Sequence, residues 1–259
     1  MPLALHWPWP GAENGGNEGI MELLKQLLDS VASKAFSVRR CSFENITGND
    51  GIKLIINKAI LSERPVHVLL TGRPGCAKTM FLMEMMRRLK NSYFIVGSNT
   101  TKAGLVNQLF ENEPKYLLID ELDKMNANDQ VSLLHLMETG IISETKVKKT
   151  RHVKLVSWVI ATTNSVEKII EPLLSRFVVL EIPEYTFEEF TEISITTLAS
   201  ENVKECTAQV IAGKVWNELG SRDIRDVVKV ARLASSIEEI SLVVRMLNRK
   251  YMFEGTNKN

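Results

Sequence analysis

The middle of the chain alternates short, almost wholly apolar runs with segments of helical periodicity. The runs that fit buried strands are VHVLLT (66–71), YFIV (93–96), KYLLID (115–120), VKLVSWVIATT (153–163) and FVVLEI (177–182). Apolar positions at helical spacing lie between them, as at 78–90 and 128–139. Because parallel strands need crossover connections and are buried on both faces, this alternation predicts an α/β fold. We expect a three-layer sandwich with a parallel central sheet.

The sequence changes character after Pro183, where strand-like runs give way to helical patterns at about 186–200, 206–219, 221–236 and 238–250. We therefore expect an α/β domain at 20–184, followed by a small all-helical domain at 185–252. The segments 1–19 and 253–259 are expected to be flexible tails, since the first is rich in Pro, Gly and Asn and has no periodicity.

Composition narrows the classes of function. The 259 residues are 44% hydrophobic and 24% charged, with a net charge of +1, so a DNA contact would have to come from a local basic patch. Cys41, Cys76 and Cys206 show no C-x-x-C spacing, which favours a reducing cytoplasm over a disulfide framework or a zinc site. No apolar run approaches the roughly 20 residues of a membrane span. Trp7 and Trp9 leave open a partner-docking peptide in the N-terminal tail.

The run 66–71 leads into GRPGCAKT, residues 72–79, which is G-x-x-x-x-G-K-[ST] with Ala77 in place of the second glycine. In such a loop, backbone N–H groups and a helix N-terminus converge on an anion. We expect Lys78 to reach the β and γ phosphates and Thr79 to bind Mg²⁺. Ala77 is tolerable if its backbone is near helical values. The expected nucleotide contacts are Gly72, Arg73, Pro74, Gly75, Cys76, Ala77, Lys78 and Thr79. The alternative is a glycine-rich turn with an incidental lysine.

Two further strand-like runs end in polar residues. Asp120 and Glu121 follow one run, and Asn164 follows another. Ligands of open α/β sheets bind at the carboxyl ends of the strands. We expect Asp120 to hold Mg²⁺ through water, Glu121 to polarise the attacking water, and Asn164 to contact the γ-phosphate. Asp123 is expected only to belong to a solvated loop.

Three arginines are candidates to complete this site. Arg176 directly precedes the final strand-like run, FVVLEI, and suits an arginine finger supplied to a neighbouring subunit, with an ordinary surface arginine as the alternative. Arg222 and Arg225 are spaced i and i+3, on one side of an expected helix that Ser221 would cap. Either could reach a nucleotide, and Arg222 is preferred.

The segments GRPGCAKT, LLIDELDKM, ATTN, LLSRF and SRDIRDVVKVARLA stand in the order found in AAA+ ATPases, and the chain resembles that superfamily from about 43 to 240. FENITGND and PLLSRFVVLEIPEYTFEEF are most similar to the RuvB-type Holliday-junction branch-migration ATPases. The resemblance implies a P-loop NTPase fold with a helical lid, ATP and Mg²⁺ as cofactors, and hydrolysis of ATP to ADP and phosphate. It also implies a homo-oligomeric ring, such as a hexamer, with Arg176 acting on the next subunit's ATP.

Some residues depart from the RuvB pattern. Asn164 is more usual in other AAA+ branches, and Ala77 before the lysine resembles the A-K-S of minichromosome-maintenance helicases. RuvB carries a winged-helix DNA-binding domain after the lid, and we expect this chain to lack it. A separate DNA-binding partner protein would then replace that domain.

A basic segment lies between the helix 128–139 and the strand that ends at Asn164. Residues 141–145 and 153–156 are expected to pair around a basic tip that holds Lys146, Lys148, Lys149, Arg151 and Lys154. The insertion resembles hairpins that touch the nucleic-acid backbone in AAA+ helicases and serve a partner protein in RuvB. A solvated charged loop is the alternative.

Together these features predict a DNA-acting ring ATPase of the branch-migration or helicase kind, with a role in DNA recombination or repair. A protein-remodelling ATPase of the MoxR or Lon kind and a clamp-loader-like switch subunit are the alternatives. The segment GSNTTKAGLVNQLFENE has no aromatic-hydrophobic tripeptide of the kind that threads polypeptides, which mildly favours DNA.

Overall fold

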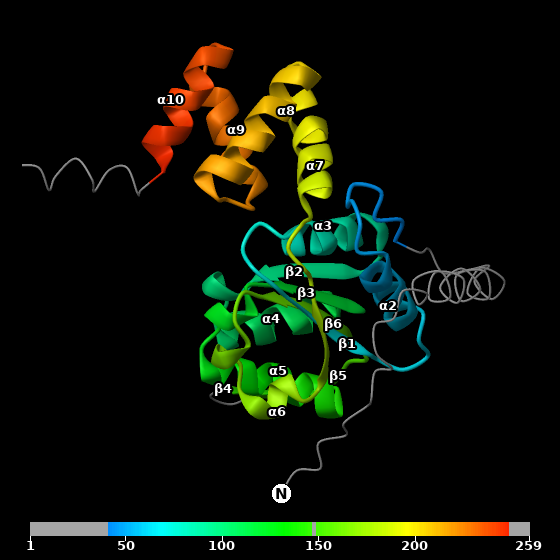
Figure 1. Cartoon of the computed structure of the whole chain (residues 1–259). Coiled ribbons are helices and arrows are strands. Elements are labelled where there is room, and N and C mark those ends of the chain that lie inside the picture. The colour runs from blue at the N-terminus through cyan, green and yellow to red at the C-terminus, as the bar shows by residue number, and fades with distance from the viewer. Residues whose placement is uncertain (1–40, 147–148, 249–259) are drawn as a thin grey trace, which may run out of the picture. The chain divides into compact units, whose positions relative to one another are not determined.

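The computed structural model describes residues 41–146 and 149–248. The expected tails at 1–19 and 253–259 lie outside the described residues. Five strands form one parallel sheet in the order β2-β3-β6-β1-β7 (Figure 1), as the sequence predicts. Their bounds are His67–Thr71 for β1, Ser92–Val96 for β2, Tyr116–Asp120 for β3, Trp158–Thr163 for β6 and Phe177–Glu181 for β7. The order places β3 and β1 on either side of β6, so the carboxyl ends of these three strands are neighbours.

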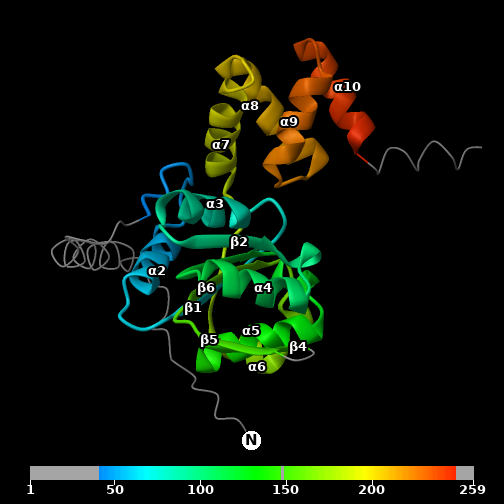
Figure 2. The same cartoon turned by 180° about the vertical axis from the view of Figure 1, so that it is seen from behind.

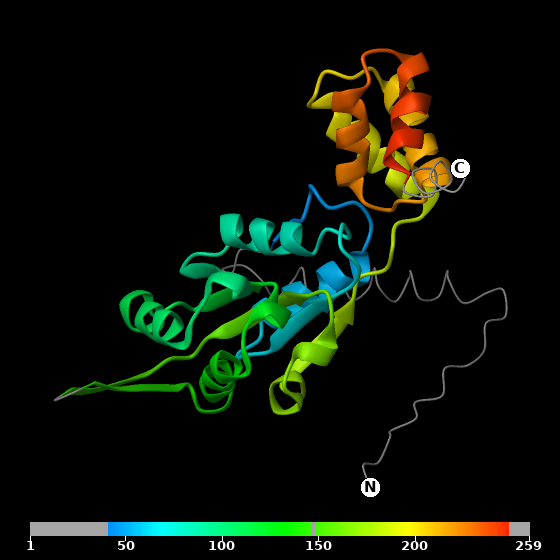
Figure 3. The same ribbon diagram turned by 90° about the vertical axis from the view of Figure 1, so that its left-hand side faces the viewer.

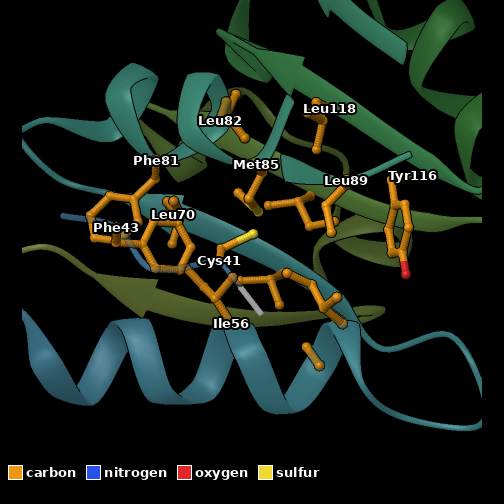
Figure 4. Packing of buried hydrophobic residues seen from close by; sticks show 14 of the residues in the cluster. Cys41, Phe43, Ile56, Leu70, Phe81, Leu82, Met85, Leu89, Tyr116 and Leu118 are labelled. Carbon is orange, nitrogen blue, oxygen red and sulfur yellow. The ribbon is translucent and has the colours of Figure 1, made fainter. Parts of the chain in front are cut away.

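Helices cover both faces of this sheet (Figure 2). Their bounds are Asp50–Ile60 for α2, Lys78–Arg88 for α3, Lys102–Asn112 for α4, Ala127–Thr139 for α5 and Glu171–Leu174 for α6. Apolar side chains of α2 and α3 pack on one face, where Ile56 and Met85 lie close to Leu70 (Figure 4). Side chains of α4, α5 and α6 pack on the other face, around Leu69 and Ile119. Both faces of the sheet are therefore buried, which is why its strands are apolar runs.

A hairpin projects from this domain (Figure 3). Strands β4, Ile141–Lys146, and β5, Lys149–Lys154, pair antiparallel from Ile141 opposite Lys154 to Lys146 opposite Lys149. The predicted bounds of the paired segments, 141–145 and 153–156, were wrong, because the ladder also includes Lys146 opposite Lys149 and ends at Lys154. The predicted single strand 153–163 is likewise two strands, separated where Leu155 N–H donates to Gly140 O at 2.7 Å. A Cβ on Gly140 would lie 2.4 Å from Leu155 O, so this crossing requires glycine.

The C-terminal part is helical, as the sequence predicts. It comprises α7 (Phe187–Ala199), α8 (Glu205–Lys214) with a π-turn at Val215–Leu219, α9 (Ile224–Leu233) and α10 (Ile237–Leu247). A capping box joins Thr186 and Glu189 at the start of α7. These helices enclose a core of their own, which includes Phe190, Ile211 and Val227. The domain boundaries at 184 and 252 stay a prediction.

Candidate functional site

The loop between β1 and α3 contains two glycines whose positions exclude a side chain. Gly72 has φ 151° and Gly75 has φ 88°. A Cβ would lie 2.7 Å from Ile182 O at the first and 2.9 Å from Asp223 Cγ at the second. Ala77 has φ 57° and ψ 10°, in the left-handed region. The condition of a near-helical backbone, under which a methyl group at Ala77 would be tolerable, is therefore not met, and an L-residue in this conformation costs roughly 1–2 kcal/mol.

Lys78 begins α3 and is only 7% exposed. Its Nζ donates to Gly72 O and to Arg73 O, both at 2.6 Å. Burial lowers the pKa of this ammonium, while nearby Asp120 acts in the opposite direction. The loop thus folds around a desolvated cation at the carboxyl end of β1.

The next residue, Thr79, joins the loop to the end of β3. Its Oγ1 donates to Asp120 Oδ2 at 2.9 Å. Thr162, on β6, contacts the same carboxylate, since its Oγ1 donates to Asp120 Oδ1 at 2.5 Å. The Thr162 hydroxyl also accepts from Glu121 N–H at 3.1 Å. One hydroxyl therefore fixes both acidic residues.

Sequence reasoning did not single out Thr162. The available signal was a second threonine beside Thr163 at the end of a strand that neighbours β3. Glu121 itself takes a left-handed conformation, with φ 55° and ψ 52°. Its hydrogen bond to Thr162 secures a backbone turn that a non-glycine residue rarely adopts.

Asp123 is buried, contrary to the prediction that it belongs to a solvated loop. It is 6% exposed and accepts from Thr163 Oγ1 at 3.2 Å and from Asn164 N–H at 3.4 Å. Asp123 therefore ties the turn after β3 to the end of β6, where Asn164 lies.

A pocket of about 820 Å³ opens over these strand ends. Nine of the sequence-predicted residues line it: Pro74, Gly75, Ala77, Lys78, Thr79, Asp120, Glu121, Asn164 and Arg225. The other lining residues come from the segment 45–47, from Met80 and Thr162, and from the helical part, which contributes Tyr185, Ile193, Thr196, Thr197, Asp223 and Ile224. The volume suits a ligand of cofactor size.

Other predicted site residues lie outside this lining. Arg73 forms an ion pair with Glu184 at 2.7 Å. Cys76 is 2% exposed and packs in the core cluster with Phe81, and burial raises the pKa of its thiol. The side chain of Cys76 is thus part of the core, although the backbone of Gly72, Arg73 and Cys76 still shapes the loop.

The three arginines have different surroundings. Arg176 lies outside the pocket and forms an ion pair with Glu138 of α5. Arg222 lies before the first turn of α9, with its guanidinium carbon 3.4 Å from the Trp216 ring centroid, and it donates to Trp216 O at 3.0 Å. Arg225 lines the pocket and its Nε donates to both oxygens of Asp223 at 2.9 Å. The structure therefore brings Arg225, rather than the preferred Arg222, to the site.

The cap of α9 also differs from the prediction. Asp223 accepts from Arg225 N–H at 2.9 Å and is the N-cap. Ser221 instead donates to Asp226 Oδ2 at 2.6 Å. The helix starts later than the sequence suggests, so Arg222 and Arg225 are not neighbours on one helical face.

The donor set fits a triphosphate with Mg²⁺. Thr79 and Asp120 offer two hard oxygen ligands, and Mg²⁺ is typically held by one or two protein oxygens together with phosphate. Among the described residues, no group of three or more His, Cys, Asp or Glu side chains could form a metal cage by itself. In the same pocket lining, Gly75 offers a backbone N–H and Lys78 offers its ammonium as hydrogen-bond donors.

Comparison with known proteins agrees with this geometry. Residues 68–184 match the model of the ATPase family associated with various cellular activities (AAA). By this match, residues 68–184 of the chain form an AAA domain. That domain runs from β1 to the segment after β7, and it contains Lys78, Asp120 and Asn164.

The fold as a whole resembles the RuvB Holliday junction branch migration motor of Thermotoga maritima. The TM-score is 0.58 at 22% identity, covering 81% of this chain and 72% of that chain. This chain is also 26% identical over 183 residues to the DNA replication licensing factor mcm2 of Schizosaccharomyces pombe, covering 55% of this chain and 22% of that protein. It is 26% identical over 159 residues to the Lon protease of Mycoplasma genitalium, covering 59% of this chain and 18% of that protein. The chain thus spans about a fifth of the length of these curated relatives. None of the helices within 41–248 is both long and apolar enough to cross a membrane.

Proposed function

We propose that this AAA+ chain binds Mg²⁺ and ATP and hydrolyses ATP to ADP and phosphate. The observation that carries the proposal is that Lys78, Thr79, Asp120, Glu121 and Asn164 line one pocket. Mg²⁺ would supply charge neutralisation at the phosphates, held by Thr79 and Asp120. Lys78 would bind the β and γ phosphates through its ammonium.

The chemistry of the remaining groups follows from their positions. Glu121 would accept a proton from the attacking water, because its carboxylate lines the pocket directly beside Asp120. Asn164 would donate its amide to the γ-phosphate and orient that water. Of the two lid arginines, Arg225 is the better candidate to contact phosphate, since Arg222 is stacked on Trp216.

We infer that Arg176 acts in the pocket of a neighbouring subunit. Its guanidinium is outside the pocket of its own chain and pairs with Glu138. An arginine supplied in trans stabilises charge on the transferred phosphoryl group. This arrangement would need a homo-oligomeric ring, for which we propose six subunits.

We further propose DNA as the substrate on which the ATPase acts, in recombination or repair and in the reducing cytoplasm. The hairpin β4–β5 carries Lys146, Lys148, Lys149, Arg151 and Lys154 in its sequence, and such cations suit phosphate contacts, direct or through a DNA-binding partner protein. The similarity to a branch migration motor and to a replication licensing factor supports this choice. The match to Lon protease favours protein remodelling as the second candidate. The free state of Cys41, Cys76 and Cys206 is consistent with a reducing compartment.

The ATPase proposal is tested by changing Glu121 to Gln. We expect Mg²⁺-dependent ATP binding to persist while turnover falls by roughly 10²–10⁴-fold, the usual contribution of a general base. The matched control is Glu111→Gln, an exposed carboxylate on α4, which should keep full turnover. Undiminished turnover in Glu121→Gln would contradict its role.

The trans arrangement is tested by mixing two inactive chains. Arg176→Ala and Glu121→Gln should each be inactive, and their mixture should recover part of the activity, because some interfaces then combine an intact Arg176 with an intact Glu121. No recovery in mixed assemblies of verified composition would argue against action in trans.

The substrate is tested by comparing ATP turnover with a four-way DNA junction, single-stranded DNA and an unfolded protein at two salt concentrations. Stimulation by DNA that declines steeply with salt is expected for backbone contacts. Stimulation by the unfolded protein alone would replace the DNA motor with the remodelling ATPase.

A further inference from the structure

One acidic residue of the pocket lies directly against the loop 72–79. Asp223 and Gly75 both line the pocket. A Cβ on Gly75 would lie 2.9 Å from Asp223 Cγ and 3.0 Å from Asp223 Oδ1. The loop 72–79 is the segment whose backbone N–H groups we expect to bind phosphate. A carboxylate therefore lies where the phosphates of a bound nucleotide would approach.

The position of this carboxylate is fixed by the start of α9. Asp223 is the N-cap residue of that helix, and its Oδ1 accepts from Arg225 N–H at 2.9 Å. The N–H of Asp223 in turn donates to Ser221 Oγ at 3.1 Å. Moving the carboxylate away from Gly75 would leave the first turn of α9 with an unpaired N–H group. The negative charge consequently stays at the pocket wall.

The same carboxylate also engages the side chain of Arg225. Arg225 Nε donates to both oxygens of Asp223 at 2.9 Å, and Nη2 donates to Oδ2 at 2.5 Å. The side chain of Arg225 is 68% exposed, against 22% for that of Asp223. Arg225 is thus the partner that can turn toward a ligand, because its long side chain is solvated and the carboxylate is held by the helix cap. While the two are paired, they present no net positive charge to a phosphate.

The balance of charges in the pocket gives this pairing a consequence for binding. The described lining carries two cations and three acids, namely Lys78, Arg225, Asp120, Glu121 and Asp223. In the proposed function Asp120 holds Mg²⁺ and Glu121 accepts a proton, whereas Asp223 has no role. Its charge opposes the binding of a polyanion, because like charges repel one another across a site that is partly shielded from water.

We propose that Asp223 competes with the phosphates of the bound nucleotide for Arg225, and thereby limits the affinity of the site. A bound phosphate would accept the Nε–H and Nη2–H donors that Asp223 now holds, while Asp223 would keep the backbone N–H of Arg225. Binding exchanges one ion pair for another, so only the difference between them adds to the affinity. The inference rests on the proposed nucleotide site and adds to it a residue that determines how tightly phosphate is held.

The experiment measures binding of ADP in the presence of Mg²⁺ by titration calorimetry. Asp223→Asn removes the charge but keeps a side-chain oxygen for the cap, since Asn and Asp are about equally good N-cap residues. We expect Asp223→Asn to bind ADP roughly five- to tenfold more tightly than the wild type, and this gain to shrink at high ionic strength. The matched control is Asp50→Asn, the same change in the exposed first turn of α2 and outside the pocket lining, which should keep the wild-type affinity.

A second substitution, Arg225→Ala, tests the competition itself when it is made in both the wild type and Asp223→Asn. The loss of ADP affinity should be larger in Asp223→Asn, because there no carboxylate has to release the guanidinium before phosphate can bind it. Comparing the two losses isolates the coupling between Asp223 and Arg225 from the effect of either residue alone.

The outcomes separate this inference from the proposed function. Unchanged or weaker binding of ADP by Asp223→Asn would overturn the inference, since the carboxylate would then be neutral or would orient Arg225 toward phosphate. Equal losses of affinity on Arg225→Ala in the two backgrounds would also overturn it. Failure of the folded wild-type chain to bind ADP or ATP would instead overturn the proposed function itself.

Discussion

Replacing Ala77 with glycine should stabilise the protein, although glycine usually destabilises. Ala77 has φ 57° and ψ 10°. An L-residue in this region carries a penalty of roughly 1–2 kcal/mol, which glycine does not. Glycine loses more backbone entropy on folding, at a cost of roughly 0.5–1 kcal/mol. The net gain in the free energy of unfolding should be about 0.5–1 kcal/mol, or roughly 1–4 °C in Tm for a chain of this size.

The assay is urea unfolding of wild type, Ala77→Gly and Ala103→Gly. Ala103 is exposed on α4 and has right-handed helical backbone, so its change to glycine should destabilise by roughly 0.5–1 kcal/mol. The two identical substitutions should therefore act in opposite directions. Loss of stability in Ala77→Gly as large as that in Ala103→Gly would refute the reasoning. ADP affinity should be kept in Ala77→Gly, because glycine meets the backbone requirement without strain.

Two further predictions concern buried groups. Burial lowers the pKa of His67 to about 4 from 6.5, so the unfolded chain takes up a proton first as pH falls. About 3 kcal/mol of stability should then be lost between pH 6.5 and 4, measured by unfolding at several pH values, and an NMR titration of His67 near 6.5 would contradict this. Burial raises the pKa of Cys41 to about 12 and also raises that of Cys76, whereas Cys206 is exposed. Only Cys206 should react with a thiol reagent in the native protein, with or without ATP, and all three in urea.

The sheet and the strand-end residues were predictable because apolar runs identify buried parallel strands. Once β1, β3 and β6 are assigned, parallel pairing alone brings Lys78, Asp120 and Asn164 to the same edge. The helical part was predictable because its apolar residues recur at the spacing of a helix with one buried face. These conclusions need no knowledge of side-chain conformation.

The polar links within the site could not be predicted in this way. Thr162 looks like an ordinary strand residue, and its hydroxyl matters only because β6 lies beside β3. Asp123 looks solvated, and its burial follows from hydrogen bonds with residues about 40 positions away along the chain. The π-turn at Val215–Leu219 is followed by α9 only from Ile224, which removes Arg222 from the helix that its spacing suggested.

The pocket draws its walls from segments as far apart in sequence as Asn45 and Arg225. Such a site has no partial form, since losing either the sheet or the helical core dismantles it. Any ligand that binds there is therefore thermodynamically linked to folding of the whole assembly of elements. At a ligand concentration 100 times its Kd, the linkage would add about 2.7 kcal/mol to the free energy of unfolding. Substitutions far from the pocket would then change the ligand concentration needed to keep the chain folded, even where they leave the affinity of the folded chain unaltered.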